Sequence, residues 1–266
     1  YDARITTRFD EADPVKSVFP TVHEFGHACY TLGLPEEDYG TPLGEARDLS
    51  VHESQSRLWE NHVGRSRPFL ARLRPMLDEH LGTAPDVDAL YGWANRVDPD
   101  NRIRVEADEL TYHLHIVLRY EIERDLVRGD LDVAEVPAVW AEKMDEYLGV
   151  DVESDAEGCL QDIHWSHGNF GYFPTYSLGS VMAAQLFEAA EADIDDLDDQ
   201  IAAGEFDDLL GAVLIPPAVE GTLGDVLCVR EGHLGVVHAT QGGGNLPLCL
   251  RSHLADRHHV DQHRHT

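Results

Sequence analysis

The sequence predicts a mainly α-helical protein, and three observations support this fold class. Across residues 1–211, apolar side chains recur at the three- and four-residue spacing of helix faces. Proline, serine and glycine residues stand where helices typically begin and end. Strand-like alternation is confined to a short extended piece near Arg4 to Arg8. We therefore expect helices to build the core, with one extended segment near the N-terminus.

The first predicted helix carries the most distinctive motif of the chain. Pro14, directly after Asp13, is a typical helix start, and Gly33 is a typical stop. Pro20 lies between them and is expected to restart or bend the helix, because proline has no N–H to donate. The sequence His-Glu-Phe-Gly-His of residues 23–27 is therefore predicted to lie on a helix.

A second helix is predicted to open at Ser50 and to run to about Gly64. The last predicted helix follows a loop rich in glycine and aromatic residues. No predicted strand separates the helices, which again indicates a mainly α class. The further helices are predicted over residues 67–81, 86–96, 104–128, 135–148 and 175–193.

Composition argues against several classes of partner. Acidic residues outnumber basic ones by 50 to 20, which gives a formal net charge of -30. Such a field repels phosphate, so neither duplex nucleic acid nor an anionic membrane surface is an expected partner. The charge is instead typical of a solvated surface adapted to a salty cytoplasm. No apolar run approaches the roughly 18 residues of a membrane-spanning helix, and we expect a soluble protein.

The cysteines indicate a reducing compartment, which fits a cytoplasmic protein. They are far apart in the chain and form no CxxC pair. This spacing argues against both a disulfide framework and a cysteine zinc site. The four residues are Cys29, Cys159, Cys228 and Cys249.

A change in composition near residue 211 predicts a boundary. Residues 1–211 hold 45 of the 50 acidic residues, whereas residues 212–266 hold 5. Histidine shifts the other way, with 9 in the first segment and 7 in the shorter second one. The second segment also lacks sustained helical periodicity and ends in a His/Arg-rich run. We expect a folded domain over residues 1–211 and a separate tail over residues 212–266.

Residues 23–27 form an HExxH motif, which is typical of a metal site. On a helix, residues four apart lie on one face about 5 to 6 Å from each other, so His23 and His27 can hold a single ion. Glu24 lies one step around the helix, where its carboxylate can reach a water at that ion and act as general base. The alternative is a chance meeting of surface histidines, but the apolar residues around the motif favour a metal site.

A catalytic zinc needs a third protein ligand and an open position for water. Glu53 is the best candidate, because it lies 26 residues after His27 and near the start of the next predicted helix. The same residue also fits a capping box, in which its carboxylate would accept the amide N–H of Ser50. Spacing alone leaves the ligand and the cap equally open.

Five stretches of the chain, in order, resemble the carboxypeptidase Taq family of metallocarboxypeptidases: DARITTRFD, HEFGHACY, HESQSRLWENHVGRS, IRVEADELTYHLHIVLRYEIE and GCLQDIHWSHGNFGYFPTYSLGS. The resemblance implies a metal held by His23, His27 and Glu53, with Glu24 as the base. Zinc is the usual metal, and cobalt activates some members. The resemblance also implies a zincin-like helical metallopeptidase fold with a deep groove, removal of residues from peptide C-termini, and usually a homodimer.

A carboxypeptidase must recognise the free α-carboxylate of its peptide substrate. A guanidinium suits this task, because it can bind both oxygens and stays charged at any working pH. The family places such a residue in its IRxxAD motif, which corresponds here to Arg104. From the residues alone, the alternative is an exposed ion pair between Arg104 and Asp108 one helical turn later.

The GxxQDxHW motif of residues 158–165 resembles a second substrate-contacting segment of the family. The resemblance assigns His164 to the peptide end or to the oxyanion. Tyr172 and Tyr176, in and after the following loop, can donate a phenolic hydrogen bond to the tetrahedral intermediate. Aromatic residues at this spacing are also typical of packing, so that alternative stays open.

Family members are considerably longer than this chain, so the resemblance covers the C-terminal half of their catalytic domain. Two other functions stay open. One is a metal-dependent endopeptidase with the same HExxH chemistry, and the other is a truncated, non-catalytic relative that binds metal or pairs with another subunit. Residues 212–266 match nothing in the family, which suggests a reading-frame disturbance or a His-rich tail that binds metal non-specifically.

Overall fold

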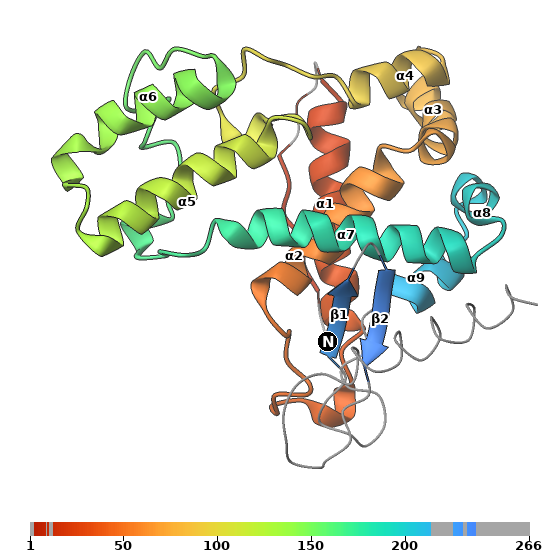
Figure 1. The fold of residues 1–266 in the computed structure, drawn as a ribbon. Coiled ribbons are helices and arrows are strands. Elements are labelled where there is room, and N and C mark those ends of the chain that lie inside the picture. The colour runs from red at the N-terminus through yellow and green to blue at the C-terminus, as the bar shows by residue number, and fades with distance from the viewer. Residues whose placement is uncertain (1–2, 9, 11–12, 214–225, 231–232, 238–266) are drawn as a thin grey trace, which may run out of the picture.

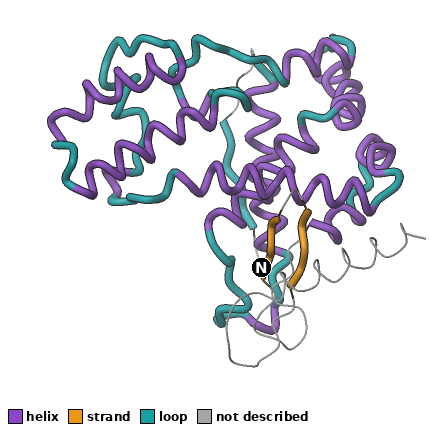
Figure 2. Tube along the Cα trace, viewed as in Figure 1, coloured by secondary structure: helices purple, strands orange, loops and turns teal. Residues whose placement is uncertain are grey.

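The structure, a computed structural model, describes residues 3–8, 10, 13–213, 226–230 and 233–237. Helices make up most of this part of the chain, as Figure 2 shows, so the predicted mainly α class is confirmed. The α-helices are α1 (Val15–Leu32), α2 (Leu49–Arg57), α3 (Arg67–Leu81), α4 (Val87–Ala94), α5 (Tyr112–Arg128), α6 (Val136–Leu148), α7 (Pro174–Asp193), α8 (Leu197–Ala203) and α9 (Asp207–Val213), and the strands are β1 (Val226–Arg230) and β2 (His233–Val237). Short 3-10 turns are η1 (Glu36–Asp38), η3 (Arg104–Glu106), η4 (Val133–Glu135) and η5 (Trp165–His167), and η2 (Leu58–Gly64) is π-helical.

Most helix ends agree with the start and stop signals of the sequence. α1 runs unbroken through Pro20 and ends before Gly33. α3 begins after Ser66, whose hydroxyl accepts the N–H of Phe69, and ends at Gly82 with a φ of 77° that only glycine adopts readily. The helices predicted between residues 67 and 96 and between residues 135 and 193 are confirmed, with ends that shift by at most two residues.

The helix predicted over residues 104–128 is wrong in its first part. Within this range only α5 is α-helical, and η3 is a single 3-10 turn separated from it by residues 107–111. The carboxylate of Asp108 accepts the N–H groups of Leu110 and Thr111 and the hydroxyl of Thr111. A side chain that bonds the nearby backbone in this way competes with helix hydrogen bonds, which explains why the helix begins after it.

Two further differences lie after residue 193. Helices α8 and α9 were not predicted, because seven residues are too few for a periodic pattern to be recognised. The sequence analysis assigned no elements to residues 212–266, and there β1 and β2 form an antiparallel pair with Val226 opposite Val237. Residues 3–8 near the N-terminus, which were predicted to be extended, belong to neither a helix nor a strand.

Helix α7 is the central element of the fold. It packs along α2 and also contacts α5, α9 and η2, while α1 packs against α2 and η2. In Figure 1, α5 and α6 lie at one end of α7, and α8 and α9 lie at the other. The two helices α1 and α2, which carry the HExxH motif and Glu53, are therefore held side by side next to α7.

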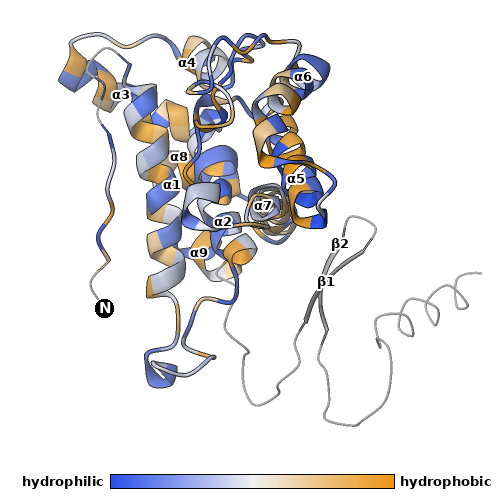
Figure 3. Cartoon of the chain, turned by 90° about the vertical axis from the view of Figure 1, so that its left-hand side faces the viewer, coloured by the Kyte–Doolittle hydropathy of each residue, from blue (hydrophilic) through white to orange (hydrophobic). Residues whose placement is uncertain are grey.

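Buried apolar side chains form several clusters rather than one continuous core. The pair α5–α6 has its own cluster, in which Leu118, Ile122, Trp140 and Met144 are at most 1% exposed. Figure 3 shows apolar and hydrophilic stretches alternating along these two helices. A second cluster joins η2, α7, α8 and α9, and a third joins α1, α3 and α4. Within the described residues, no helix combines the length and the apolarity needed to cross a membrane.

Candidate metal centre and substrate site

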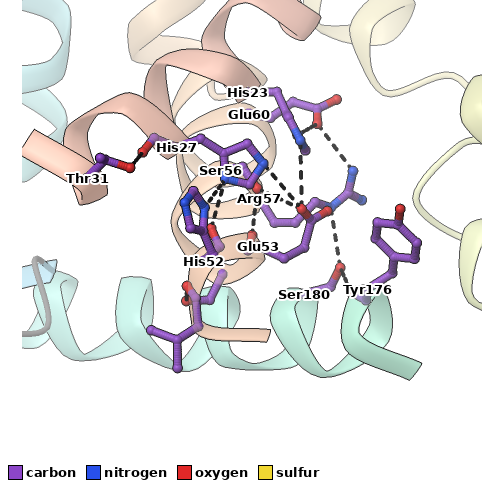
Figure 4. Close-up of polar contacts among 12 residues, drawn as sticks. His23, His27, Thr31, His52, Glu53, Ser56, Arg57, Glu60, Tyr176 and Ser180 are labelled. Carbon is purple, nitrogen blue, oxygen red and sulfur yellow. Dashed lines mark hydrogen bonds and ion pairs between the residues drawn. The ribbon is translucent and has the colours of Figure 1, made fainter. Parts of the chain in front are cut away.

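Helix α1 presents two imidazoles to one carboxylate of α2. The ring centroids of His23 and His27 lie 4.8 Å apart. The Nε2 atom of His23 lies 3.8 Å from Oε2 of Glu53, and that of His27 lies 3.5 Å from the same oxygen. Potential ligand atoms of the three residues all lie within 4.8 Å of one another. Figure 4 shows both rings turned toward Glu53.

Helix α2 begins one residue earlier than predicted, and Asp48 caps it. Oδ1 of Asp48 accepts the N–H of Ser50 at 2.7 Å and that of Val51 at 3.0 Å. The capping-box alternative for Glu53 is therefore wrong, because the amide of Ser50 already has a partner. Glu53 instead accepts a hydrogen bond from Oγ of Ser56 at 3.1 Å and is 7% exposed.

Two glycines let the neighbouring helices approach α2 closely at this point. A Cβ atom on Gly26, inside the HExxH motif, would lie 2.7 Å from the carbonyl oxygen of Gln55 and 2.7 Å from Cα of Ser56. A Cβ atom on Gly179 of α7 would lie 2.8 Å from Cβ and Cγ of Glu53. The small residues on both sides of α2 thus set how close Glu53 comes to the two histidines.

We expect Gly26→Ala to lower the free energy of unfolding by about 1–3 kcal/mol, the usual range for overpacking. Both atoms that the new methyl group would meet belong to the backbone, so α1 and α2 must move apart. Gly92→Ala is the matched control, because a Cβ there meets nothing within 4 Å. Urea denaturation followed by circular dichroism measures both effects. Equal midpoints for Gly26→Ala and the wild type would contradict the close-packing argument.

The other nitrogen of each ring already has a partner. Nδ1 of His23 lies 2.9 Å from Oε2 of Glu60, and Nδ1 of His27 lies 3.0 Å from the carbonyl oxygen of His52. Nδ1 of His27 also lies 2.6 Å from Nδ1 of His52. A neutral imidazole that donates from Nδ1 carries its lone pair on Nε2, the nitrogen that faces Glu53 in both rings. Two such nitrogens and one carboxylate fit the donor set of a divalent-metal site.

Burial and neighbouring charges set the protonation of these groups. Burial lowers the pKa of His27 to about 4, and the nearby imidazoles of His23 and His52 add to this effect. Burial also raises the pKa of Glu53 above its ordinary value. For His23, burial acts to lower the pKa, but the hydrogen bond and charge of Glu60 outweigh it and leave the pKa raised. His27 is therefore neutral near neutral pH, as a metal ligand must be.

Glu60 is a residue that the sequence analysis did not single out. Burial acts to raise its pKa, but Arg57, His23 and Arg65 outweigh burial and hold this pKa far below its ordinary range. The sequence does contain a signal for its position, because Glu60 follows Glu53 by seven residues. Seven residues are close to two helical turns, which places both carboxylates on one face.

Glu24 lies next to His23 on α1 and is partly buried. Within the described part of the chain, no hydrogen bond or ion pair engages its carboxylate. The negative charge of Glu24 acts to raise the pKa of His52, although burial outweighs it and leaves that pKa lowered. The carboxylate thus stands close to the HExxH face without being committed to another side chain.

Arg104 lies in η3 and is 6% exposed. Its Nε and Nη2 atoms donate to Oδ1 of Asp162 at 3.0 and 2.7 Å, and Nη1 donates to the hydroxyl of Tyr112 at 3.3 Å. The alternative of an exposed pair with Asp108 on a helix face is therefore wrong. Arg104 uses Nε and one N–H of Nη2 for Asp162 and one N–H of Nη1 for Tyr112, which leaves one N–H on each Nη atom for a ligand.

A second arginine shares the same carboxylate. Nε of Arg119 donates to Oδ2 of Asp162 at 2.6 Å, and the side chain of Arg119 is fully buried. Burial lowers the pKa of Arg119 to about 10, partly offset by Asp162, so its guanidinium stays charged at neutral pH. Two guanidiniums facing one carboxylate leave an excess of positive charge around Arg104. Such a region suits an anionic group, as the α-carboxylate of a peptide is.

The three other predicted substrate residues lie in the same cluster. Nε2 of His164 lies 3.0 Å from the hydroxyl of Tyr176, and the guanidinium of Arg104 lies 4.8 Å from the Tyr176 ring centroid. The ring of Tyr172 lies 5.1 Å from that of His164 and 5.3 Å from that of Tyr176. Nδ1 of His164 is buried without a hydrogen-bond partner among the described residues.

Tyr112 connects this cluster to the histidine pair. Its hydroxyl accepts from Arg104, and its ring lies 4.7 Å from the guanidinium carbon of Arg57. Arg57 in turn donates to Glu60 at 3.2 Å and to the hydroxyl of Ser180 at 3.3 Å. The candidate metal centre is thus a neighbour of the positive cluster, which consists of Arg104 and Arg119 around Asp162. The sequence analysis could not predict this role for Tyr112 or Arg57, because each is marked only by lying inside one of the five stretches that resemble the family.

Comparison with known proteins connects this arrangement to a family. The sequence profile described as carboxypeptidase Taq (M32) metallopeptidase matches residues 1–213. The chain is 49% identical over 211 residues to thermostable carboxypeptidase 1 of Thermus thermophilus, covering 79% of this chain and 41% of that protein. It is 41% identical over 207 residues to carboxypeptidase 1 of Bacillus subtilis, covering 77% of this chain and 41% of that protein.

Solved structures agree with the sequence comparison. Metallocarboxypeptidase 1 of Trypanosoma cruzi matches with a TM-score of 0.74 and 45% identity, over 78% of this chain and 42% of that one. The M32 carboxypeptidase of Deinococcus radiodurans R1 matches with a TM-score of 0.73 and 41% identity, over 78% of this chain and 42% of that one. The chain therefore spans less than half of the length of these relatives.

Proposed function

Because the chain belongs to the carboxypeptidase Taq (M32) metallopeptidase family, we propose that it forms the metal-binding and carboxylate-binding part of a metal-dependent carboxypeptidase. Its substrates are peptides with a free C-terminus. The observation that carries the proposal is the meeting of His23, His27 and Glu53 beside the positive cluster around Arg104. A metal centre next to a carboxylate-binding group is what hydrolysis of the last peptide bond requires.

His23, His27 and Glu53 would hold the metal, and zinc suits this set of two imidazoles and one carboxylate. Cobalt is a further candidate, because it accepts the same ligands. When bound, such an ion polarises the scissile carbonyl and makes water a stronger nucleophile near neutral pH. Glu24 takes the proton of the attacking water and passes it to the leaving amine.

Arg104 holds the α-carboxylate of the peptide and so fixes which bond reaches the metal centre. His164 is proposed to contact the peptide end or the oxyanion, and its hydrogen bond to Tyr176 supports a shared role. Tyr172 and Tyr176 are proposed to donate to the tetrahedral intermediate. We further propose residues 1–211 as the catalytic segment and residues 212–266 as a separate tail.

The proposal includes a homodimeric enzyme in a salty cytoplasm. The net charge of -30 and the excess of acidic over basic residues support the adaptation to salt. In the described residues, the free cysteines Cys29 and Cys159 support a reducing compartment. The dimer rests on the family resemblance.

A pair of peptides tests the carboxypeptidase proposal against the endopeptidase alternative. We expect the chain, loaded with Zn2+, to release C-terminal residues from a short peptide and to leave the same peptide uncut when its C-terminus is amidated. Arg104→Ala should lower kcat/KM for the free peptide by about 10- to 100-fold, because a charge-assisted pair of about 1.5–3 kcal/mol is lost. Release is followed by mass spectrometry. Cleavage of the amidated peptide at an internal bond would favour the endopeptidase.

The share of the relatives that the chain spans, 41% to 42%, favours a second candidate function. In this alternative the chain binds metal or pairs with another subunit without hydrolysing peptides. Uptake of Zn2+ by the chain, with no release from either peptide, would support it. The measurement that separates the two is metal content by atomic absorption, made on the same sample as the peptide assay.

A further inference from the structure

Glu60, which is not one of the three proposed metal ligands, makes contact with one of them, His23. Glu60 is 9% exposed and lies in η2, a π-helical segment, a rare form that proteins often keep at functional sites. Its Oε2 accepts from Nδ1 of His23 at 2.9 Å and from Nη1 of Arg57 at 3.2 Å. Its Oε1 accepts from Nη2 of Arg65 at 2.8 Å. Every oxygen of this carboxylate is therefore held in place by a charged or polar donor.

The two glutamates on this face meet opposite sides of one imidazole. Glu53 approaches the Nε2 side of His23 at 3.8 Å, whereas Glu60 bonds the Nδ1 side at 2.9 Å. Figure 4 shows the ring of His23 between the two carboxylates. Because the ring nitrogens point away from each other, a donor bond from Nδ1 to Glu60 directs the Nε2 lone pair toward Glu53 and His27.

We propose that Glu60 is a positioning residue for the metal centre. By accepting the Nδ1 proton it fixes the tautomer and the ring orientation of His23, and its negative charge makes Nε2 a stronger donor to a divalent cation. The inference deepens the proposed function and rests on the metal centre of His23, His27 and Glu53. Arg57 and Arg65 serve this arrangement by holding the carboxylate of Glu60 in one orientation.

A purely structural role for Glu60 is the alternative. In that case the carboxylate only offsets the charges of Arg57 and Arg65 in a buried place. Its loss would then lower the stability of the metal-free protein but leave the geometry of the metal centre unchanged. The readouts must therefore report on His23 and on the bound cation, in addition to folding.

The first measurement uses the metal-free wild type. Long-range nitrogen–proton correlation spectra at about pH 9 report which nitrogen of His23 carries the proton of a neutral ring. We expect the proton on Nδ1. His23→Ala assigns the signals, because its spectrum lacks them. A proton on Nε2 of His23 would overturn the proposal.

The second measurement compares Glu60→Ala, Glu60→Gln and the wild type in Zn2+ affinity and in the absorption spectrum of bound Co2+. We expect Glu60→Ala to weaken Zn2+ binding by about 10- to 100-fold and to change the Co2+ spectrum. Glu60→Gln should recover part of the affinity, because its amide oxygen can still accept the Nδ1 proton. If Glu60→Ala does not fold, Glu60→Gln alone tests the proposal. In that case we expect Glu60→Gln to bind Zn2+ more weakly than the wild type.

Glu121→Gln is the matched control, because Glu121 is also held by a cation, Lys143 at 2.6 Å, but on the α5–α6 pair. It should bind Zn2+ as the wild type does. Wild-type affinity and spectrum in the Glu60 variants would overturn the positioning role while leaving the metal centre intact. Unchanged affinity in His23→Ala would instead reject the metal centre itself, so the two failures are distinguishable.

Discussion

We expect Glu24→Gln to lower kcat for peptide hydrolysis by about 10²- to 10⁴-fold, the usual contribution of a general base. Glutamine has nearly the same size and shape as glutamate but cannot take a proton from water. Glu24 has no hydrogen-bond partner in the described part of the chain, so its replacement breaks no contact that the fold depends on. The loss should therefore appear in kcat, with Zn2+ content and thermal stability close to those of the wild type.

Glu36→Gln is the control. Glu36 lies exposed in η1, so this substitution removes the same single charge at the surface, away from the candidate site. Amino acid release from a short peptide, measured with metal content on the same samples, gives the comparison. Equal rates for Glu24→Gln and the wild type would reject Glu24 as the base. Loss of Zn2+ together with activity would show that Glu24 supports metal binding instead.

The sequence could predict the local half of the candidate site. The approach of His23 to His27 follows from helix geometry, because residues four apart on one helix always share a face. The position of Glu53 could not be settled by spacing, since a cap and a ligand require the same residue at the same place. The structure excludes the capping box, because the carboxylate of Asp48 already accepts the N–H groups of Ser50 and Val51.

The positive cluster depends on contacts between distant parts of the chain, which periodicity cannot reveal. Asp162 reaches Arg104 across 58 residues and Arg119 across 43 residues. The predicted helix over residues 104–128 made the pair with Asp108 look plausible, but that helix does not begin until Tyr112. The error in one helix start thus made the alternative partner of Arg104, Asp108, look plausible.

We expect Asp162→Ala to lower the free energy of unfolding by about 3–5 kcal/mol, the usual cost of removing one partner from a buried ion pair. Asp162 is the carboxylate that both Arg104 and Arg119 contact, and the three side chains are 9%, 7% and 0% exposed. Without it, two buried guanidiniums face each other uncompensated. Urea denaturation followed by circular dichroism measures the effect.

Glu121→Ala supplies the contrast, because it removes a more exposed ion pair with Lys143. Such pairs contribute about 0–1 kcal/mol, so this variant should unfold at nearly the wild-type urea concentration. A loss for Asp162→Ala no larger than that for Glu121→Ala would mean that water or another group already compensates the two arginines.

The pH dependence of stability gives an independent check on the same carboxylate. Burial acts to raise the pKa of Asp162, but Arg119 and Arg104 outweigh it and leave this pKa below its ordinary value. A carboxylate with a depressed pKa in the folded state stabilises fully above its unfolded pKa of about 3.9 and loses that contribution as the pH falls through the folded pKa. The stability difference between the wild type and Asp162→Asn should therefore be constant near neutral pH and shrink below about pH 4. A difference that stays constant into this acidic range would mean that Asp162 stabilises the cluster through its shape and hydrogen bonds rather than through its charge.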